Sequence, residues 1–304
     1  MSRLATAFGA LTAAGAATAA YGSLVERNAF TLRRFDVPVL APGTRPLRVL
    51  HISDLHLTAG QGRKQRWIAE LARLEPDLVV NTGDTISDAR AVGAILTCLR
   101  PLARFPAVFV PGNNDYYAPR PSTPARYFTG ARPRPRGPDM PWGELRAGMA
   151  GQGWVDVTNA RTRLTCAGRP VAFGGVDDPH LERDRYDLIS GPADPDAAVR
   201  LGLLHSPEPR LLERFAADGY ELALAGHTHG GQVRVPFGPA IVTNCGIDVH
   251  RARWLHRWDA RMWLHVCAGL GTNPYMPVRF ACRPEATLLT LVGRDRPARR
   301  RGSG

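Results

Sequence analysis

The chain has 304 residues, 44% hydrophobic and 22% charged, and this length fits one large domain or two small ones. These ordinary values exclude wholesale disorder, a collagen-like fibre and a protein with many membrane spans. The formal net charge of +12 favours anionic partners such as nucleic acid or an acidic membrane, but Lys64 is the only lysine, so a codon bias towards arginine accounts for part of the charge.

The five cysteines are an odd number and show no C-x-x-C spacing, the pattern typical of zinc and redox sites. Most of them lie in apolar surroundings, where free cysteine packs as a small hydrophobic residue. No disulfide framework is therefore expected. The cysteines do not indicate the compartment, because a domain with free thiols can lie on either side of a bacterial membrane.

The N-terminal segment from Leu4 to Tyr21 contains no charged residue. As a helix it would extend about 27 Å, close to the roughly 30 Å hydrocarbon core of a bilayer. A secretory signal peptide is one alternative, since Arg3 precedes the segment and Ala17–Ala19 resembles a cleavage site. A soluble alanine-rich helix is another. We expect residues 1–24 to form a membrane anchor or signal segment, and residues 25–45 a linker and first strand.

Short apolar runs alternate with helical spacing over the next part of the chain. Strands are predicted at Arg48–Ser53, Asp77–Asn81 and Ala107–Val110, and helices at Arg63–Leu74 and Asp88–Leu99. Each helix is followed by a proline that ends it. This β-α-β-α-β order predicts a layered α/β fold.

The segment Tyr116–Met140 is rich in proline and arginine, and it is predicted to be a long surface loop. Two interpretations stay open. The loop is either a solvated connection or a lid that contacts an anionic substrate beside a functional site.

The remainder is predicted to be mainly β structure, and the basic tail Arg294–Gly304 is predicted to be disordered. The predicted elements are helices at Trp142–Ala150 and Pro209–Ala217, a hairpin through Trp254–Cys267, and strands at Trp154–Val157, Thr162–Cys166, Val171–Gly174, Arg200–Leu204, Glu221–Ala225 and Ala286–Leu291.

Five polar motifs follow the ends of predicted strands. Ligand sites in open α/β sheets lie beyond the carboxyl ends of the strands, so the five loops are expected to converge at one edge. In chain order the motifs are Asp54-Leu55-His56, Gly83-Asp84, Gly112-Asn113-Asn114-Asp115, His205 and Gly226-His227-Thr228-His229-Gly230-Gly231.

The residue types in these motifs suit two metal ions. Carboxylate, amide oxygen and imidazole bind Mn, Fe, Zn and similar ions, and no thiolate is present to favour a softer metal. In Asp54-Leu55-His56 and in His227-Thr228-His229, alternate residues of extended backbone point to the same side, so both can reach one cluster. Asp115 is expected to support the ligands by hydrogen bonding. Each motif alone is a weak signal, but together they indicate a metal site.

In this order the motifs resemble those of the calcineurin-like metallophosphoesterases, and the similarity runs from about Arg48 to Leu291. The resemblance implies a β-sandwich flanked by helices, with residues 46–293 as one catalytic domain between the membrane segment and the tail 294–304. It also implies two divalent ions (Mn, Fe, Zn or Mg) and a shared hydroxide that attacks phosphorus in line. By this resemblance, Asp54, His56 and His229 hold the first metal, Asp84 bridges both metals, and Asn113, His205 and His227 complete the second.

The chain departs from the family at Asn114, where the family usually has a histidine that protonates the leaving oxygen or steadies the phosphate. Asparagine donates a hydrogen bond but is no general acid near pH 7. The bacterial UDP-2,3-diacylglucosamine pyrophosphatases are similar in lacking this histidine. With Asn114 and the bridging Asp84 as the expected catalytic residues, we expect a preference for phosphoanhydrides or activated diesters, whose leaving groups need little protonation.

A narrower similarity is to the membrane-anchored bacterial branch of this family. It rests on the N-terminal apolar segment, on Gly226–Gln232, on Gly269–Gly271 and on Pro277–Glu285. It implies a hydrolase of phosphodiester or pyrophosphate bonds at the cell membrane, held by a single N-terminal span. The expected substrate is a phosphorylated small molecule or a lipid, such as a UDP-diacylglucosamine-like molecule.

Two alternatives from other classes stay open. The arginine-rich surface would also suit a nuclease or a nucleic-acid-binding phosphoesterase, but no recognisable nucleic-acid module is present, so nucleic acid is not the expected partner. A metal-free scaffold protein derived from an esterase is the other alternative, but every ligand position is filled. The sequence makes no prediction of the oligomeric state, the native metals or the side of the membrane.

Overall fold

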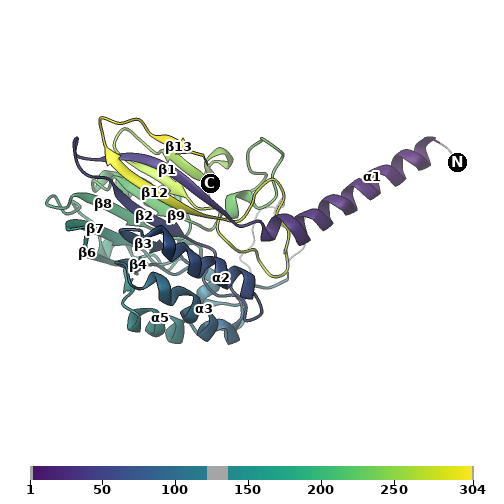
Figure 1. Ribbon diagram of the computed structural model, residues 1–304, viewed down its shortest axis with the longest axis horizontal. Helices are drawn as coiled ribbons and strands as arrows, with labels where there is room; N and C mark the ends of the chain where they lie inside the picture. Colours follow the sequence, from purple (N-terminus) through teal and green to yellow (C-terminus); the bar gives the residue numbers. More distant parts are fainter. Residues whose placement is uncertain (1–2, 122–135, 303–304) are drawn as a thin grey trace.

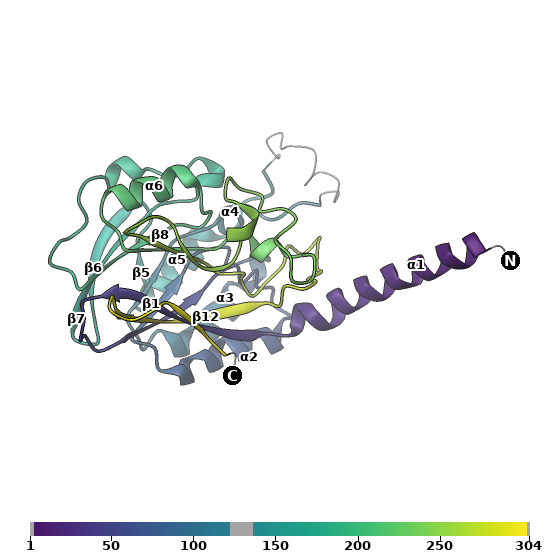
Figure 2. The ribbon, with the colours of Figure 1, turned by 90° about the horizontal axis from the view of Figure 1, so that it is seen from above.

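The computed structural model describes residues 3–121 and 136–302. Two β-sheets pack face to face, and helices cover the outer face of each sheet (Figures 1 and 2). The predicted α/β fold, a layered β-sandwich flanked by helices, is confirmed. One long helix, α1 (Arg3–Ala20), projects away from this body.

The first sheet has seven strands in the order β13-β1-β12-β2-β3-β4-β5, and strands β2 to β5 run parallel. In chain order its strands are β1 (Thr31–Leu40), β2 (Leu47–Ile52), β3 (Leu78–Asn81), β4 (Ala107–Phe109), β5 (Val155–Asp156), β12 (Glu285–Gly293) and β13 (Arg299–Arg301).

The second sheet has six strands in the order β10-β11-β9-β8-β7-β6, and strands β7, β8, β9 and β11 run parallel. In chain order its strands are β6 (Ala160–Cys166), β7 (Arg169–Gly175), β8 (Val199–Leu203), β9 (Leu222–Ala225), β10 (Trp254–Arg257) and β11 (Trp263–Val266).

The two-residue alternation of strand side chains explains how the layers stack. In β2, Leu47 and Val49 point into the core between the sheets, whereas Leu50 and Ile52 point to the helices. The outer face of the first sheet is covered by α2 (Gly62–Glu70), α3 (Val92–Leu99) and α5 (Trp142–Gly151), and that of the second by α6 (Pro209–Ala217). Both faces of the central parallel strands are therefore buried, as parallel strands require.

The helices and inner strands confirm the elements expected from the sequence. The helix predicted at Pro209–Ala217 is α6 with the same bounds, since proline is favoured in the first turn and Leu211, Leu212 and Phe215 are buried. The helix predicted at Arg63–Leu74 is α2 followed by a tighter turn, Leu71–Leu74. The predicted hairpin forms β10 and β11.

The first and last strands of the chain, β1 and β13, lie side by side at one edge of the first sheet. The residues following α1 remain helical to Asn28 and lead into β1, which pairs in parallel with β12. The tail differs from the predicted disorder, because Arg299–Arg301 pair with β1 as β13. Arg301 contacts Asp36 at 2.7 Å, and the Arg300 guanidinium lies 4.1 Å from the centre of the Trp254 ring. These contacts hold a segment whose net charge alone indicated disorder.

The segment rich in proline and arginine lies partly outside the described residues, at 122–135. Its described ends run together, because Tyr117 pairs with Asp139 and the Ala118 amide donates to the Pro138 carbonyl at 2.8 Å. Whether it acts as a lid therefore stays a prediction.

A buried histidine pair in the core predicts a loss of stability in acid. Burial lowers the pKa of His51 from 6.5 to about 3, and the His51 Nδ1 lies 2.8 Å from the Nδ1 of His265. The unfolded chain therefore binds the proton first, so stability is full above pH 6.5 and falls as pH drops towards 3. The free energy of unfolding of the metal-free protein would be measured in urea at pH 8 and at pH 5. We expect the decrease from pH 8 to pH 5 to be about 2 kcal/mol smaller in His51→Gln than in the parent.

His250→Gln is the control. Because the His250 side chain is exposed, this variant should lose as much stability between pH 8 and pH 5 as the parent does. An equal loss of stability in His51→Gln and the parent would contradict this role of His51.

Candidate metal centre

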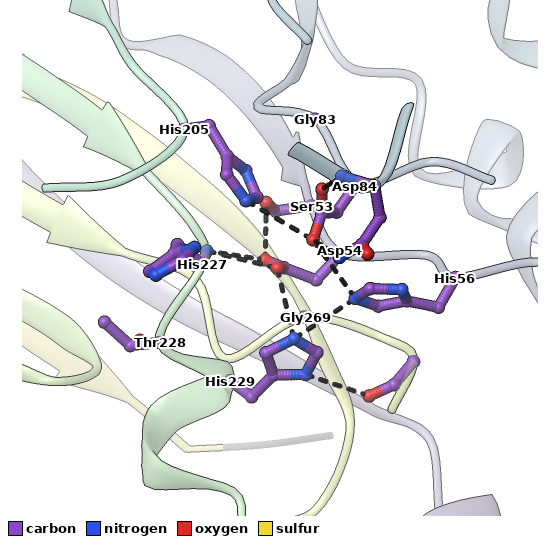
Figure 3. A network of polar contacts seen from close by, with 12 residues as sticks. Ser53, Asp54, His56, Gly83, Asp84, His205, His227, Thr228, His229 and Gly269 are labelled. Atoms are coloured by element: carbon purple, nitrogen blue, oxygen red, sulfur yellow. Dashed lines mark hydrogen bonds and ion pairs between the residues drawn. The ribbon is translucent and has the colours of Figure 1, made fainter. Parts of the chain in front are cut away.

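The polar motifs meet at one edge of the sandwich, where both sheets contribute. Asp54 and His56 follow β2, and Asp84 follows β3; from the other sheet, His205 follows β8 and His229 lies beyond β9 (Figure 3). Asn113 and Asn114 begin the short helix α4 (Asn113–Tyr116) after β4, and His227 lies just beyond β9. The predicted convergence of the five loops is confirmed.

Four side chains form a tight ligand cluster. Asp54, His56, Asp84 and His229 each offer one ligand atom, and these atoms all lie within 4.8 Å of one another. The His56 Nε2 lies 3.4 Å from Asp84 Oδ2, and the His229 Nε2 lies 3.5 Å from Asp54 Oδ1. The two Nε2 atoms lie 3.1 Å apart, a spacing at which only one of them can carry a proton. This donor set could hold a divalent cation.

A second group of donors lies on the other side of Asp84. The His205 Nε2 is 3.4 Å from Asp84 Oδ2, and the His205 and His227 rings are 5.2 Å apart. Among the described residues, the His205 Nε2 and the Asn113 Oδ1 are buried without a hydrogen-bond partner. A buried acceptor without a partner is costly, and a cation bound beside it would remove that cost.

Backbone carbonyls fix the ring orientation of three histidines. A carbonyl only accepts, so the His205 Nδ1 donates to Thr82 at 2.7 Å, the His227 Nε2 donates to Asn244 at 3.3 Å, and the His229 Nδ1 donates to Gly271 at 3.3 Å. When such a ring is neutral, as it is in a metal-bound histidine, the other nitrogen keeps its lone pair. For His205 and His229 that nitrogen faces Asp84 and Asp54, as a metal ligand must.

Several carboxyl groups are buried at this site, so their negative charges are unfavourable unless a cation lies beside them. Burial, together with the nearby Asp84 charge, raises the pKa of Asp54 to about 6 and that of Asp115 to about 7. Burial alone would raise the pKa of Asp84 too, but the nearby positive charge of His205 holds it well below its usual range. Positive charge at this site therefore stabilises the carboxylates.

Asn114 contacts the candidate ligand Asp84, and Asp115 contacts the backbone of the loops on either side of it. The Asn114 backbone N–H donates to Asp84 Oδ1 at 2.8 Å, and its side-chain Nδ2 donates to Asp84 Oδ2 at 2.7 Å. Asp115 accepts from the backbone amides of Thr85 at 2.8 Å and Gly112 at 2.9 Å, which ties the loop after β3 to the loop after β4. The supporting role of Asp115 stays a prediction.

The site is built on an unusual backbone. The five site residues Asp54, His56, Asp84, His227 and His229 all have positive φ, between 41° and 67°, which is uncommon for residues other than glycine. Such strained residues cluster at functional sites, because the surrounding structure must hold them.

Glycine makes room for two of the ligands. A Cβ atom on Gly226 would lie 2.4 Å from Asp54 Oδ2, and one on Gly112 would lie 2.4 Å from Asp84 Oδ1. Both positions therefore require glycine, and both carboxylates sit directly against backbone.

Sequence reasoning assigned no role to a buried arginine behind the cluster. Arg279 is completely buried, and its guanidinium donates to the carbonyls of Ala268 at 2.7 Å, Gly269 at 3.1 Å and Gly271 at 2.7 Å. It also reaches the His229 carbonyl at 3.4 Å. The signal was present in the sequence, as an arginine between apolar residues, but its partners lie in other loops.

The chain is similar to a known protein family and to several bacterial proteins. The family model described as Calcineurin-like phosphoesterase matches residues 47–231. The uncharacterised protein YpbG of Bacillus subtilis (strain 168) is 28% identical over 291 residues, covering 94% of this chain and 96% of YpbG. Phosphodiesterase YaeI of Escherichia coli (strain K12) is 26% identical over 295 residues, covering 92% of this chain and 96% of YaeI.

A relative from a vertebrate carries a membrane-related name. The zebrafish (Danio rerio) transmembrane protein with metallophosphoesterase domain is 26% identical over 279 residues, which cover 84% of this chain and 56% of that protein. The similarity to these three relatives extends beyond the residues that the family model matches.

Proposed function

The chain belongs to the calcineurin-like phosphoesterase family and is a hydrolase of phosphoester bonds, and from this premise we propose that it is a dinuclear, metal-dependent phosphodiesterase or pyrophosphatase attached to a membrane. A lipid-linked phosphate ester or anhydride is the proposed substrate class. The proposal has three parts, which concern the metals, the leaving group and the membrane.

The convergence of ligand atoms on both sides of Asp84 carries the proposal. Asp54, His56 and His229 would hold one ion, Asp84 would lie between the two, and Asn113, His205 and His227 would hold the other. The support comes from the 4.8 Å cluster on one side and from the buried, unpartnered Asn113 Oδ1 and His205 Nε2 on the other. Hard oxygen and imidazole donors of this kind suit divalent ions of the first transition row.

When bound, such ions would polarise the phosphoryl oxygens and make water a nucleophile near neutral pH. The residues of the chain do the rest. Asn114 and the backbone of α4 hold both oxygens of Asp84, and the carbonyls of Thr82, Asn244 and Gly271 hold the histidine rings in one orientation. This preorganisation means that the ligands need not rearrange during the reaction.

The proposed class of leaving group is inferred from the side chain of Asn114. Its side-chain amide donates to Asp84 and has no proton to give near pH 7. Pyrophosphates and activated diesters release anions that are stable without protonation, so they suit this site better than alkyl esters.

Membrane attachment is proposed for the N-terminal helix. The helical stretch Ala7–Asn28 has 22 residues, and its most apolar part has a mean hydropathy of 1.2. Only 6% of that part is buried against the rest of the protein. The stretch is therefore long and apolar enough to cross a membrane. The name of the zebrafish relative supports the same proposal. A lipid-linked substrate would then lie in the same bilayer as the enzyme.

An activity screen of the full chain in detergent, reconstituted with Mn, Zn, Fe or Mg, tests the proposed function. The panel would contain a phosphomonoester, a phosphodiester, a nucleotide-sugar lipid, a phosphoanhydride and duplex DNA. We expect metal-dependent hydrolysis that is fastest on the anhydride or the lipid-linked pyrophosphate. Absence of bound metal together with absence of hydrolysis would contradict the proposal, and preferred cleavage of DNA would favour a nuclease.

Replacing Asn114 tests its influence on the leaving group. We expect Asn114→His to raise the turnover of an unactivated alkyl diester relative to a nitrophenyl diester by up to about 10²-fold, the low end of what a general acid contributes. Asn114→Ala is the control, because it also loses the contact with Asp84 but gains no acid. Equal substrate ratios in the two variants would place residue 114 off the path of the leaving group.

A further inference from the structure

The base of the N-terminal helix is joined directly to the loops behind the metal centre. The Arg279 amide donates to the Gly22 carbonyl at 3.2 Å, and the buried Glu26 carboxylate accepts from the amides of Ala281 at 3.1 Å and Cys282 at 2.6 Å. A Cβ atom on Gly22 would lie 2.7 Å from the Arg279 oxygen. The helix end and the segment 279–282 therefore lie at the same height along the helix axis.

The length of the helical stretch determines how far the helix end and the segment 279–282 lie from the centre of a bilayer. The 22 residues of Ala7–Asn28 extend about 33 Å as a helix, against a hydrocarbon core of roughly 30 Å. A span that uses most of this stretch leaves the core close to Gly22 and Glu26. The loops packed against these two residues must then lie in or near the headgroup region.

Exposed apolar side chains gather around this helix and these loops. Ten large hydrophobic side chains are exposed within the described residues, and Leu188 alone among them lies elsewhere. Five are on the N-terminal helical stretch. The other four are Val235, Phe237, Ile241 and Tyr275, and Phe237 is fully exposed.

Hydrogen bonds tie the loops that carry these side chains to the helix base. Val233 pairs with Phe280, and the Gln232 side chain donates to the Met276 carbonyl at 2.9 Å. The buried Arg234 donates to the carbonyls of Gly230 and Gly238, each at 2.7 Å. These contacts hold the loop 235–241 in a shape that leaves its apolar side chains exposed instead of folded back on the core.

A cavity lined by two arginines and one glutamate lies on another side of the helix base. It has a volume of about 260 Å³, and its lining includes Asn28, Phe30, Arg63, Arg66, Trp67 and Glu70. The Phe30 and Trp67 rings lie 5.6 Å apart. Arginine and tryptophan are the side chains that favour the headgroup level of a membrane, where they meet phosphates and apolar chains together.

We propose that these features form one docking face that rests on the lipid bilayer: the apolar side chains of loop 235–241 and Tyr275 enter its surface, and Arg63 and Arg66 meet anionic headgroups. This inference rests on the proposed membrane attachment and adds a second, peripheral contact to it. Continuity with the spanning helix identifies the bilayer as the occupant of the face. Removing large apolar side chains from water is favourable, so a few such contacts suffice to orient a domain that is already anchored.

Docking would bring the metal centre to the membrane surface. Arg234 connects the apolar loop to the Gly230 carbonyl, one residue after the ligand His229, and Arg279 connects the helix base to the His229 carbonyl. A phosphate group in the headgroup layer could then reach the ligands without leaving the bilayer.

Site-directed fluorescence of the full chain tests the docking face. A polarity-sensitive thiol label is placed on the exposed position of Phe237→Cys and, as a matched control, on that of Leu188→Cys. Leu188 ends the turn that begins at Tyr186, whose ring packs against Phe215 of α6, and α6 lies away from α1 in Figure 2. Labelling of the parent measures the background from Cys245, the one native cysteine that is not fully buried. Each protein is reconstituted into phosphatidylcholine–phosphatidylglycerol vesicles, and quenching by aqueous iodide and by lipid-attached nitroxide is measured.

We expect the Phe237→Cys label to lose at least half of its iodide quenching and to be quenched by the nitroxide lipid, whereas the Leu188→Cys label keeps its full iodide quenching. A protein that floats with the vesicles but whose two labels respond alike would overturn docking and leave the membrane attachment intact. A protein that does not float overturns both. Shielding that grows with the protein-to-lipid ratio would assign the face to a second copy of the chain and overturn the bilayer as its occupant.

Discussion

Asp84→Ala is expected to lower turnover by at least about 10³-fold and to deplete both proposed metals. The Asp84 carboxylate lies 3.4 Å from both the His56 and the His205 rings, so it is the side chain that joins the two donor groups. Metal ions supply several kcal/mol of transition-state stabilisation, and 1.4 kcal/mol corresponds to a tenfold change in rate. Metal content by elemental analysis and turnover on a phosphodiester would be measured on the same sample.

Two further variants separate loss of charge from loss of fold. Asp84→Asn keeps the shape of the side chain and should also lose metal. Asp88→Ala removes a nearby carboxylate that caps the following turn through the Arg90 amide, and it should keep both metal and turnover. Near-normal turnover of Asp84→Ala, with both metals retained, would disprove the assignment of Asp84 as the bridge.

Arg279→Met is expected to cost about 3–5 kcal/mol of stability and to weaken metal binding. The completely buried guanidinium donates to carbonyls of three loops, including that of the ligand His229. Methionine fills much of the same volume but leaves the carbonyls of Ala268 and Cys282 without the donor that Arg279 supplies, and each buried group without a partner costs about 1–3 kcal/mol. Urea unfolding would give the change in stability, and titration with Mn the change in affinity.

Arg283→Met is the matched control, since Arg283 lies in the same segment but is exposed. Its stability should change by no more than about 0.5 kcal/mol. If Arg279→Met unfolded at the same urea concentration as Arg283→Met and bound metal equally well, the loops around His229 would not depend on Arg279.

Much of the fold was predictable because local patterns and tertiary packing agree. The apolar run before Asp54 became β2, and the amphipathic spacing of Leu211, Leu212 and Phe215 became the buried face of α6. The tail was the exception. Its arginines indicated disorder, but contacts with Asp36 and Trp254, far away in the chain, order Arg299–Arg301.

The convergence of the candidate ligand residues was also predictable, because each follows a strand and has the chemistry of a metal donor. Their supports were not. The carbonyls that orient the histidine rings belong to Thr82, Asn244 and Gly271, and backbone carbonyls have no sequence signature. The contact of Asn114 with Asp84 was likewise hidden, since a residue that replaces a histidine gives no indication of its new partner.

The sequence by itself determined the order of strands and helices and the kinds of side chain that meet at the sheet edge, because both follow from short-range patterns. The tertiary structure alone decided which nitrogen of each histidine faces the cluster and which buried atoms stay unpartnered. It alone also placed the helix base beside the loops of the metal centre. These features depend on contacts between segments distant in the chain, such as Gly22 with Arg279, and local pattern carries no information about such distances.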